Sequence, residues 1–228
     1  MRDRLVGRPW LIVPVGTTEQ HGPHLPLGVD SIIVERLADD LSAHFGIPRA
    51  PTLEYGVNTP ARLAFTAGAT LRRKTLHRVL NELVESWEIG ACIREFVVVT
   101  AQGGEAHQEA LSTIRASQAR IRVVDIFAMD FDGVLEGPGG PIHGGEIDTS
   151  LLLYIAPQLG RMAMAQDFGL TPKEMNRYRR GESRPIPVTA GGSLGFPSLA
   201  SPQKGERLYR FIFDRIADRC FDFAHKEG

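Results

Sequence analysis

The stretch WLIVPVGTTEQHGPHLPLGVDSIIVERLADDLSAHF, residues 10–45, decides the fold class. It opens with an apolar run, residues 10–16, which is typical of a strand buried on both faces. A polar loop follows, and residues 30–45 then repeat apolar side chains with the period of a helix. These side chains are Ile33, Leu37, Leu41 and Phe45. The order strand, loop, helix predicts the first unit of an α/β fold.

The same order recurs along the rest of the chain. Helices are predicted at residues 72–91, 106–120, 146–156 and 206–226, and strands at 95–100 and 121–128. Pro157 is expected at or just past the end of a helix, because proline cannot continue one. Alternating strands and helices predict a three-layer α/β/α sandwich with a mostly parallel central sheet. A length of 228 residues favours a single domain, residues 1–228.

Composition excludes several classes of partner. The 26 Lys and Arg residues nearly cancel the 27 Asp and Glu residues, for a formal charge of -1, so neither nucleic acid nor an anionic membrane is indicated. Cys92 and Cys220 are far apart and form no disulfide framework. No apolar run approaches the roughly 20 residues of a membrane helix, and the start lacks a secretory signal. We expect a soluble cytoplasmic protein.

Polar residues gather where the predicted strands end, which is where ligands bind in open α/β folds. Glu19, His21 and Asp30 follow the first strand within a dozen positions. If that strand continued through TTEQH, its period of two would direct Glu19 and His21 to the same side. Both could then reach one cavity.

Two further clusters follow later strands. In the first, TAQGGE, Gly103 and Gly104 would let the backbone approach a ligand closely. In the second, HGGEIDTS, His143 and Glu146 stand at the junction of a loop and a helix. An imidazole and three carboxylates, from His21, Glu19, Asp30 and Glu146, suit a divalent cation such as Zn²⁺, Mn²⁺ or Fe²⁺. Such an ion would activate water for attack on an amide.

Purely structural roles remain open for the same residues. Asp30 could be a helix N-cap and Glu146 a first-turn residue that complements a helix start. Glu19 and His21 could lie in an ordinary surface turn. The glycines of AQGGE could also cradle a phosphate at the start of a helix.

The motifs themselves resemble those of the creatininase (creatinine amidohydrolase) family. PVGTTEQHGPHLPLGVD, residues 14–30, is similar to the family's opening motif, with Glu-Gln-His-Gly, His-Leu-Pro and an acidic residue. HGGEIDTS, residues 143–150, is similar to its His-Ala-Gly-Glu motif, and GGSLGFPSLASPQKG, residues 191–205, to its late glycine-rich motif. The resemblance therefore spans nearly the whole chain.

The resemblance implies an α/β/α sandwich, commonly a homohexamer, with a two-metal centre that hydrolyses amide or cyclic amide bonds. By this resemblance Asp30 would bridge the metals, Glu19 would bind one and His21 the other. Glu146 would complete the His21 side, and His143 would act as the general acid or base.

The sequence departs from the family pattern at two places. Gln102 stands where the family has a metal-binding histidine, so the Glu19 side should hold an ion weakly. His107, five residues further on, is a candidate to replace that histidine. An expected Glu-His pair falls near Pro60 and Ala61, in a segment that shapes the family's substrate site.

Two hypotheses of different classes follow. The first is a metal-dependent amidohydrolase with one firmly held ion and a weak second, acting on a small-molecule amide other than creatinine. In it Gln102, Gly103 and Gly104 line the substrate site. The second is a creatininase-fold protein with a degenerate metal site, which serves as a binding or scaffold protein. Gln102 favours the second hypothesis, whereas His143 and Glu146 favour the first.

Overall fold

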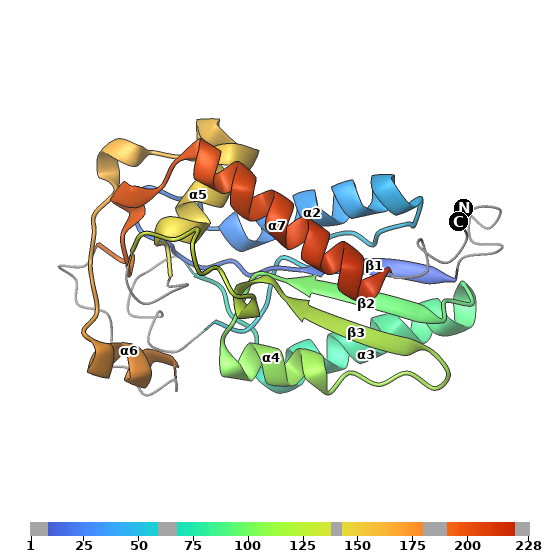
Figure 1. Cartoon of the computed structure of the whole chain (residues 1–228). Coiled ribbons are helices and arrows are strands. Elements are labelled where there is room, and N and C mark those ends of the chain that lie inside the picture. Colours follow the sequence, from blue (N-terminus) through green and yellow to red (C-terminus); the bar gives the residue numbers. More distant parts are fainter. Residues whose placement is uncertain (1–8, 59–67, 138–142, 180–190, 222–228) are drawn as a thin grey trace.

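A computed structural model describes residues 9–58, 68–137, 143–179 and 191–221. It contains three strands, β1 (Trp10–Val15), β2 (Glu95–Thr100) and β3 (Arg120–Asp125). The helices are α2 (Val29–Phe45), α3 (Arg73–Gly90), α4 (Glu105–Ser112), α5 (Glu146–Ile155), α6 (Pro172–Arg179) and α7 (Pro202–Cys220) (Figure 1). Pro60 and Ala61 lie outside the described residues.

The three described strands form one parallel sheet in the order β1-β2-β3. Trp10 pairs with Glu95 and Val15 with Thr100, so β1 and β2 end at the same level. Arg49 and Leu53 form isolated parallel bridges to the other side of β1. Because β1 is flanked on both sides, the residues that follow it emerge from the interior of the sheet.

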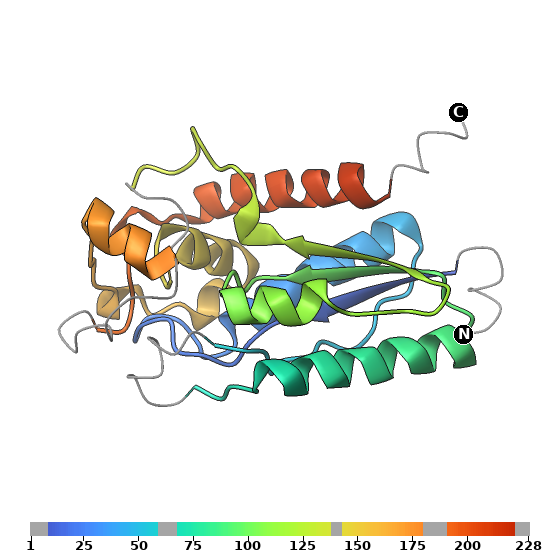
Figure 2. The same ribbon diagram turned by 90° about the horizontal axis from the view of Figure 1, so that it is seen from below.

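Helices cover both faces of this sheet. Helices α2, α5 and α7 lie on one face, and α3 and α4 lie on the other, as the two perpendicular views show (Figures 1 and 2). Successive residues of β1 alternate between the two cores: Ile12 belongs to the α2–α5–α7 side, whereas Leu11 and Val13 belong to the α3–α4 side. The predicted three-layer α/β/α sandwich with a parallel sheet is therefore confirmed.

Two predicted boundaries are wrong after β2. The helix predicted at 106–120 ends at Ser112, because the carboxylate of Glu88 accepts the backbone N–H groups of Ser117, Gln118 and Ala119. Those N–H groups are thus bound outside any helix. The strand predicted at 121–128 is β3, which begins at Arg120 and ends at Asp125.

Helix α7 begins four residues before the predicted start at 206. Ser201 caps it, since its hydroxyl accepts the N–H of Lys204. Gly205 then lets α7 approach α5 closely, because a Cβ at this position would lie 1.9 Å from the carbonyl oxygen of Ser150. Helix α5 ends at Ile155, just before Pro157, as predicted.

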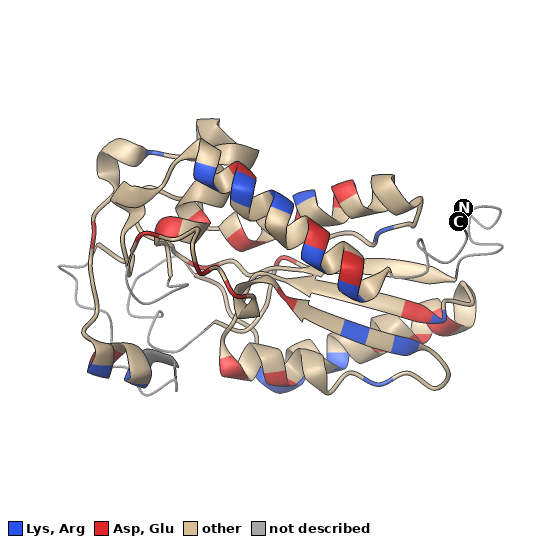
Figure 3. Cartoon of the chain, in the orientation of Figure 1, with Lys and Arg blue, Asp and Glu red and all other residues tan. Residues whose placement is uncertain are grey.

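Charges on the exposed helices are mixed in sign. In Figure 3 α7 carries both basic and acidic residues along its length. Along this described helix the two signs alternate, so α7 itself presents no continuous field of one sign. None of the described helices combines the length and the apolar character needed to cross a bilayer.

Candidate metal centre

The polar cluster lies where β1 and β2 end and where α2 and α5 begin. Strand β1 is followed by Glu19 and His21, and β2 by Gln102, while Asp30 lies in the first turn of α2 and His143 just before α5. All five side chains are buried. Buried ionisable groups are costly unless they are paired or bind a metal, so an ordinary surface turn at Glu19 and His21 is excluded.

Three of these residues form a group with the spacing of metal ligands. One donor atom each from Glu19, His21 and His143 lies within 4.8 Å of the others. Oε1 of Glu19 is 3.8 Å from Nε2 of His21 and 3.6 Å from Nδ1 of His143. Ligands of a tetrahedral zinc ion stand about 3.3 Å apart. Small movements would therefore bring these atoms onto a cation of that size.

Asp30 adds a second carboxylate to this group. Its Oδ1 lies 3.2 Å from Nε2 of His21, and apart from that contact it has no hydrogen-bond partner among the described residues. The hydroxyl of Thr17 donates to the other oxygen, Oδ2. The N-cap of α2 is Gly28, so the alternative that Asp30 caps this helix is wrong. Nitrogen and carboxylate donors of this kind fit Zn²⁺, Mn²⁺ or Fe²⁺.

The orientation of His21 directs one ring nitrogen at the carboxylates. Nδ1 lies 3.2 Å from the main-chain oxygen of Glu19, so the other ring nitrogen, Nε2, points toward Asp30. Burial acts to lower the pKa of His21, but the carboxylates of Asp30, Asp148 and Glu19 outweigh it and raise the pKa to about 9. The site thus concentrates negative charge that either a proton or a metal cation can balance.

Gln102 presents a hydrogen-bond donor to this site. Its Nε2 donates to Oε1 of Glu19 at 2.7 Å, and its Oε1 accepts the N–H of Gly104 at 2.9 Å. The amide oxygen is therefore bound by the main chain and directed away from the carboxylate. In this conformation Gln102 supplies an outer-shell hydrogen bond to Glu19 and no lone pair for an ion.

The first glycine after Gln102 lies beside a carboxylate that the sequence did not single out. Gly103 is exposed, and a Cβ there would lie 3.4 Å from Oδ2 of Asp125, at the end of β3. Burial, together with the charge of Asp30, raises the pKa of Asp125 to about 6. Its position at the end of a parallel strand is the signal that could have identified it.

The structure does not bring Glu146 into the group of Glu19, His21 and His143. Its carboxylate contacts Nζ of the buried Lys204 and accepts the N–H groups of Glu136 at 3.0 Å and Gly137 at 2.8 Å. Glu146 is the first residue of α5, the helix-start position that the sequence left open for it.

Asp148, two residues further on, is a carboxylate that the sequence reasoning missed. It is buried, accepts the N–H of Gly144 at 2.7 Å, and its charge acts on His21. Gly144 itself has φ +64, and a Cβ there would lie 2.4 Å from the main-chain oxygen of His21. The loop before α5 therefore packs directly on the residues that follow β1.

The remaining buried histidines have structural partners. His107 accepts the N–H of Val57 at Nδ1 and lies 3.0 Å from the hydroxyl of Thr100 at Nε2, so it does not take the place of Gln102. His24 lies 3.0 Å from the hydroxyl of Thr149. Burial lowers the pKa of each histidine to about 4, with the charge of His21 adding to the effect at His24.

The chain is similar in sequence to a known family and to several of its members. Residues 1–220 match the model of the Creatininase family, described as creatinine amidohydrolase. The mycofactocin precursor peptide peptidase of Mycolicibacterium smegmatis is 30% identical over 220 residues, which cover 92% of this chain and 84% of the relative. Creatinine amidohydrolase of Pseudomonas putida is 26% identical over 230 residues, which cover 91% of this chain and 87% of the relative.

Solved creatininase structures share the fold. A mutant creatininase of Zn-Zn type has a TM-score of 0.76 at 21% identity, with 96% of this chain and 94% of that chain covered. The structure "Creatininase Mn" has a TM-score of 0.74 at 21% identity, again with 96% of this chain and 94% of that chain covered. The family match over nearly the whole sequence and the shared sandwich lead to one conclusion: the chain belongs to the creatininase family.

Proposed function

We propose that the protein is a metal-dependent amidohydrolase that cleaves a carbon-nitrogen bond of a small amide. The observation that carries this proposal is the buried cluster beyond the end of β1, in which Nε2 of His21 lies 3.8 Å from Oε1 of Glu19 and 3.2 Å from Oδ1 of Asp30. A divalent ion bound there would supply Lewis-acid activation of water and of the substrate carbonyl. The Zn-Zn and Mn forms of related creatininases support zinc or manganese.

The chain's own residues would orient the reactants around that ion. Glu19, His21 and Asp30 would hold it, and the hydrogen bond from Gln102 would fix the carboxylate of Glu19. His143 lies close enough to Glu19 to hold or move a proton beside the reacting bond. Gly103 is exposed and lies beside Asp125, where the substrate would approach the main chain. Glu146 as a ligand stays a prediction, since its carboxylate now contacts Lys204.

We infer one firmly held ion per chain, because Gln102 directs N–H groups at the side where the family pattern has a histidine. A substrate other than creatinine is favoured by the sequence departure at Pro60 and Ala61. It is also favoured by the 30% identical relative, which is a peptidase.

Metal analysis of the purified protein tests the proposal. After loading with Zn²⁺ or Mn²⁺ and dialysis, elemental analysis should find about one ion per chain. The His21→Ala variant should lose it, whereas His44→Ala, which removes an exposed histidine on α2, should keep it. Gln102→His should raise the stoichiometry toward two. The absence of bound ion in the loaded parent protein would refute the proposal.

A second candidate function is binding without catalysis. The hydrogen bond from Gln102 to Glu19 favours this function, because the bond can satisfy the Glu19 carboxylate in place of a metal ion. A panel of formamides, short peptides and cyclic amides separates the two functions. A hydrolase should release product from at least one class in the metal-loaded state and lose that activity in His21→Ala. Binding of ions without turnover of any class would support the non-catalytic role.

A further inference from the structure

Gln20 is a buried residue of the opening motif to which no role has been given. Its Oε1 accepts the N–H of Gly22 at 2.9 Å, and its Nε2 donates to the carbonyl oxygen of Gly192 at 2.9 Å. A main-chain N–H can only donate and a main-chain carbonyl can only accept. These two contacts therefore determine which end of the Gln20 amide carries hydrogen.

The amide of Gln20 also faces His143. Its Nε2 lies 3.1 Å from Nε2 of that ring. One hydrogen of the amide is used by Gly192, so the other is available to the imidazole. The contact is a hydrogen bond only when Nε2 of His143 carries a lone pair, which places the ring hydrogen of the neutral imidazole on Nδ1.

The other side of the ring agrees with this assignment. Nδ1 of His143 lies 3.6 Å from Oε1 of Glu19, so an N–H there faces a carboxylate. The opposite tautomer would set two N–H groups against each other at Gln20 and a lone pair against Glu19. The main-chain N–H of Leu194 also donates to the carbonyl oxygen of His143 at 2.7 Å. The segment that binds Gln20 thus fixes His143 as well.

We propose that Gln20 is a positioning residue that holds His143 as its Nδ1–H tautomer. The Nδ1–H of His143 then faces the carboxylate of Glu19 and the reacting groups, and His143 is not a ligand of the ion. The inference rests on the proposed function for the identity of the site, while the tautomer itself follows from the contacts of Gln20 with Gly22, Gly192 and His143.

Nitrogen-15 NMR of the histidine rings in metal-free protein tests the tautomer directly. In the parent protein, titrated from pH 7 to pH 10, neutral His143 should show a protonated Nδ1 and an unprotonated Nε2. Gln20→Met keeps the side-chain length but removes the donor, and it should give a mixture of both tautomers. Gln20→Glu replaces the donor by an acceptor and should move the hydrogen to Nε2. An Nε2–H tautomer in the parent protein would overturn the proposal.

Loading with cadmium-113 gives an independent readout of ligation. Scalar coupling to nitrogen-15 should appear at Nε2 of His21, and its appearance at Nδ1 of His143 would overturn the inference. His143→Ala should keep the ion content of the parent protein. If no ion binds at all, the proposed metal-dependent function is refuted. The tautomer of His143 is decided separately, by the nitrogen-15 spectra of the metal-free protein.

Discussion

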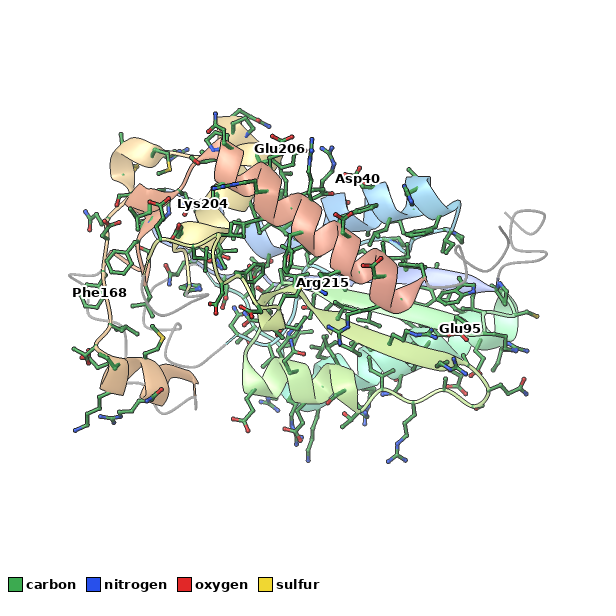
Figure 4. All side chains as sticks on the ribbon, viewed as in Figure 1. Asp40, Glu95, Phe168, Lys204, Glu206 and Arg215 are labelled. Carbon is green, nitrogen blue, oxygen red and sulfur yellow. The ribbon has the colours of Figure 1, made fainter. Side chains whose placement is uncertain are left out.

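Lys204→Met tests the buried ion pair that holds the start of α5 against the start of α7. Figure 4 labels Lys204 on α7. Its Nζ contacts the carboxylate of Glu146, and it lies 2.7 Å from Glu136 Oε1 and 2.7 Å from the carbonyl oxygen of Leu199. The lysine is 2% exposed and Glu146 is 7% exposed, so little solvent can replace the lost partner.

The structure sets the expected size of the effect. Removing one member of a buried ion pair costs about 3–5 kcal/mol, because the other charge stays buried. Glu146 keeps the hydrogen bonds from the N–H groups of Glu136 and Gly137, which offset part of that cost. We therefore expect a loss near the lower limit, about 3 kcal/mol. For a chain of this length that corresponds to a fall of about 6–12 °C in Tm.

Urea unfolding of metal-free protein measures this loss, and a double-mutant cycle with Glu146→Gln isolates the pair. The coupling energy between the two positions should be about 2 kcal/mol. Lys74→Met, at an exposed position of α3, is the matched control and should change stability by less than about 0.5 kcal/mol. A loss below about 1 kcal/mol for Lys204→Met with no coupling would refute the ion pair and leave Glu146 available as a metal ligand.

Three further substitutions test neighbouring features by urea unfolding. Burial raises the pKa of Asp125 from 3.8 to about 6, so ionisation of this carboxyl lowers the stability of the folded protein as pH rises through that range. Asp125→Asn should therefore raise the free energy of unfolding by about 2–3 kcal/mol at pH 8 and by much less at pH 4. Burial acts to raise the pKa of Glu88, but its three backbone N–H donors outweigh burial and lower it. Glu88→Gln should therefore cost about 2 kcal/mol at pH 7, and the cost should vanish as acid protonates the parent carboxylate. Gly144→Ala should cost at least about 2 kcal/mol, since its φ is +64 and the added Cβ meets His21; an unchanged midpoint would contradict this backbone conformation.

Much of the fold could be predicted from local sequence patterns. The apolar runs at 10–16 and 95–100 gave β1 and β2, because a strand buried on both faces has few alternatives. In residues 30–45 an apolar side chain recurs at every fourth position, which places these side chains on one face of a helix and predicted α2. The helix predicted at 106–120 was too long, since Glu88 binds its last N–H groups from a different helix.

The residues of the site also fall into those that the sequence predicted and those that only the structure placed. The opening motif alone placed Glu19, His21 and Asp30 together, because all three follow one strand and the spacing between them is short. The predicted carboxylate from the later motif could not be assigned by spacing. Glu146 and Asp148 are two residues apart on one helix, and only packing directs the first to Lys204 and brings the charge of the second to His21.

The sequence by itself determined the family and the layered fold class, since periodicity and motif spacing are local properties of the chain. The tertiary structure decided what each buried group binds. Gln102 donates to Glu19 because the backbone N–H of Gly104 donates to its amide oxygen and leaves its NH₂ group toward the carboxylate. His143 received its orientation from Gln20 and the segment at Gly192. Hydrogen bonds between segments remote in sequence set those orientations, and no local pattern encodes them.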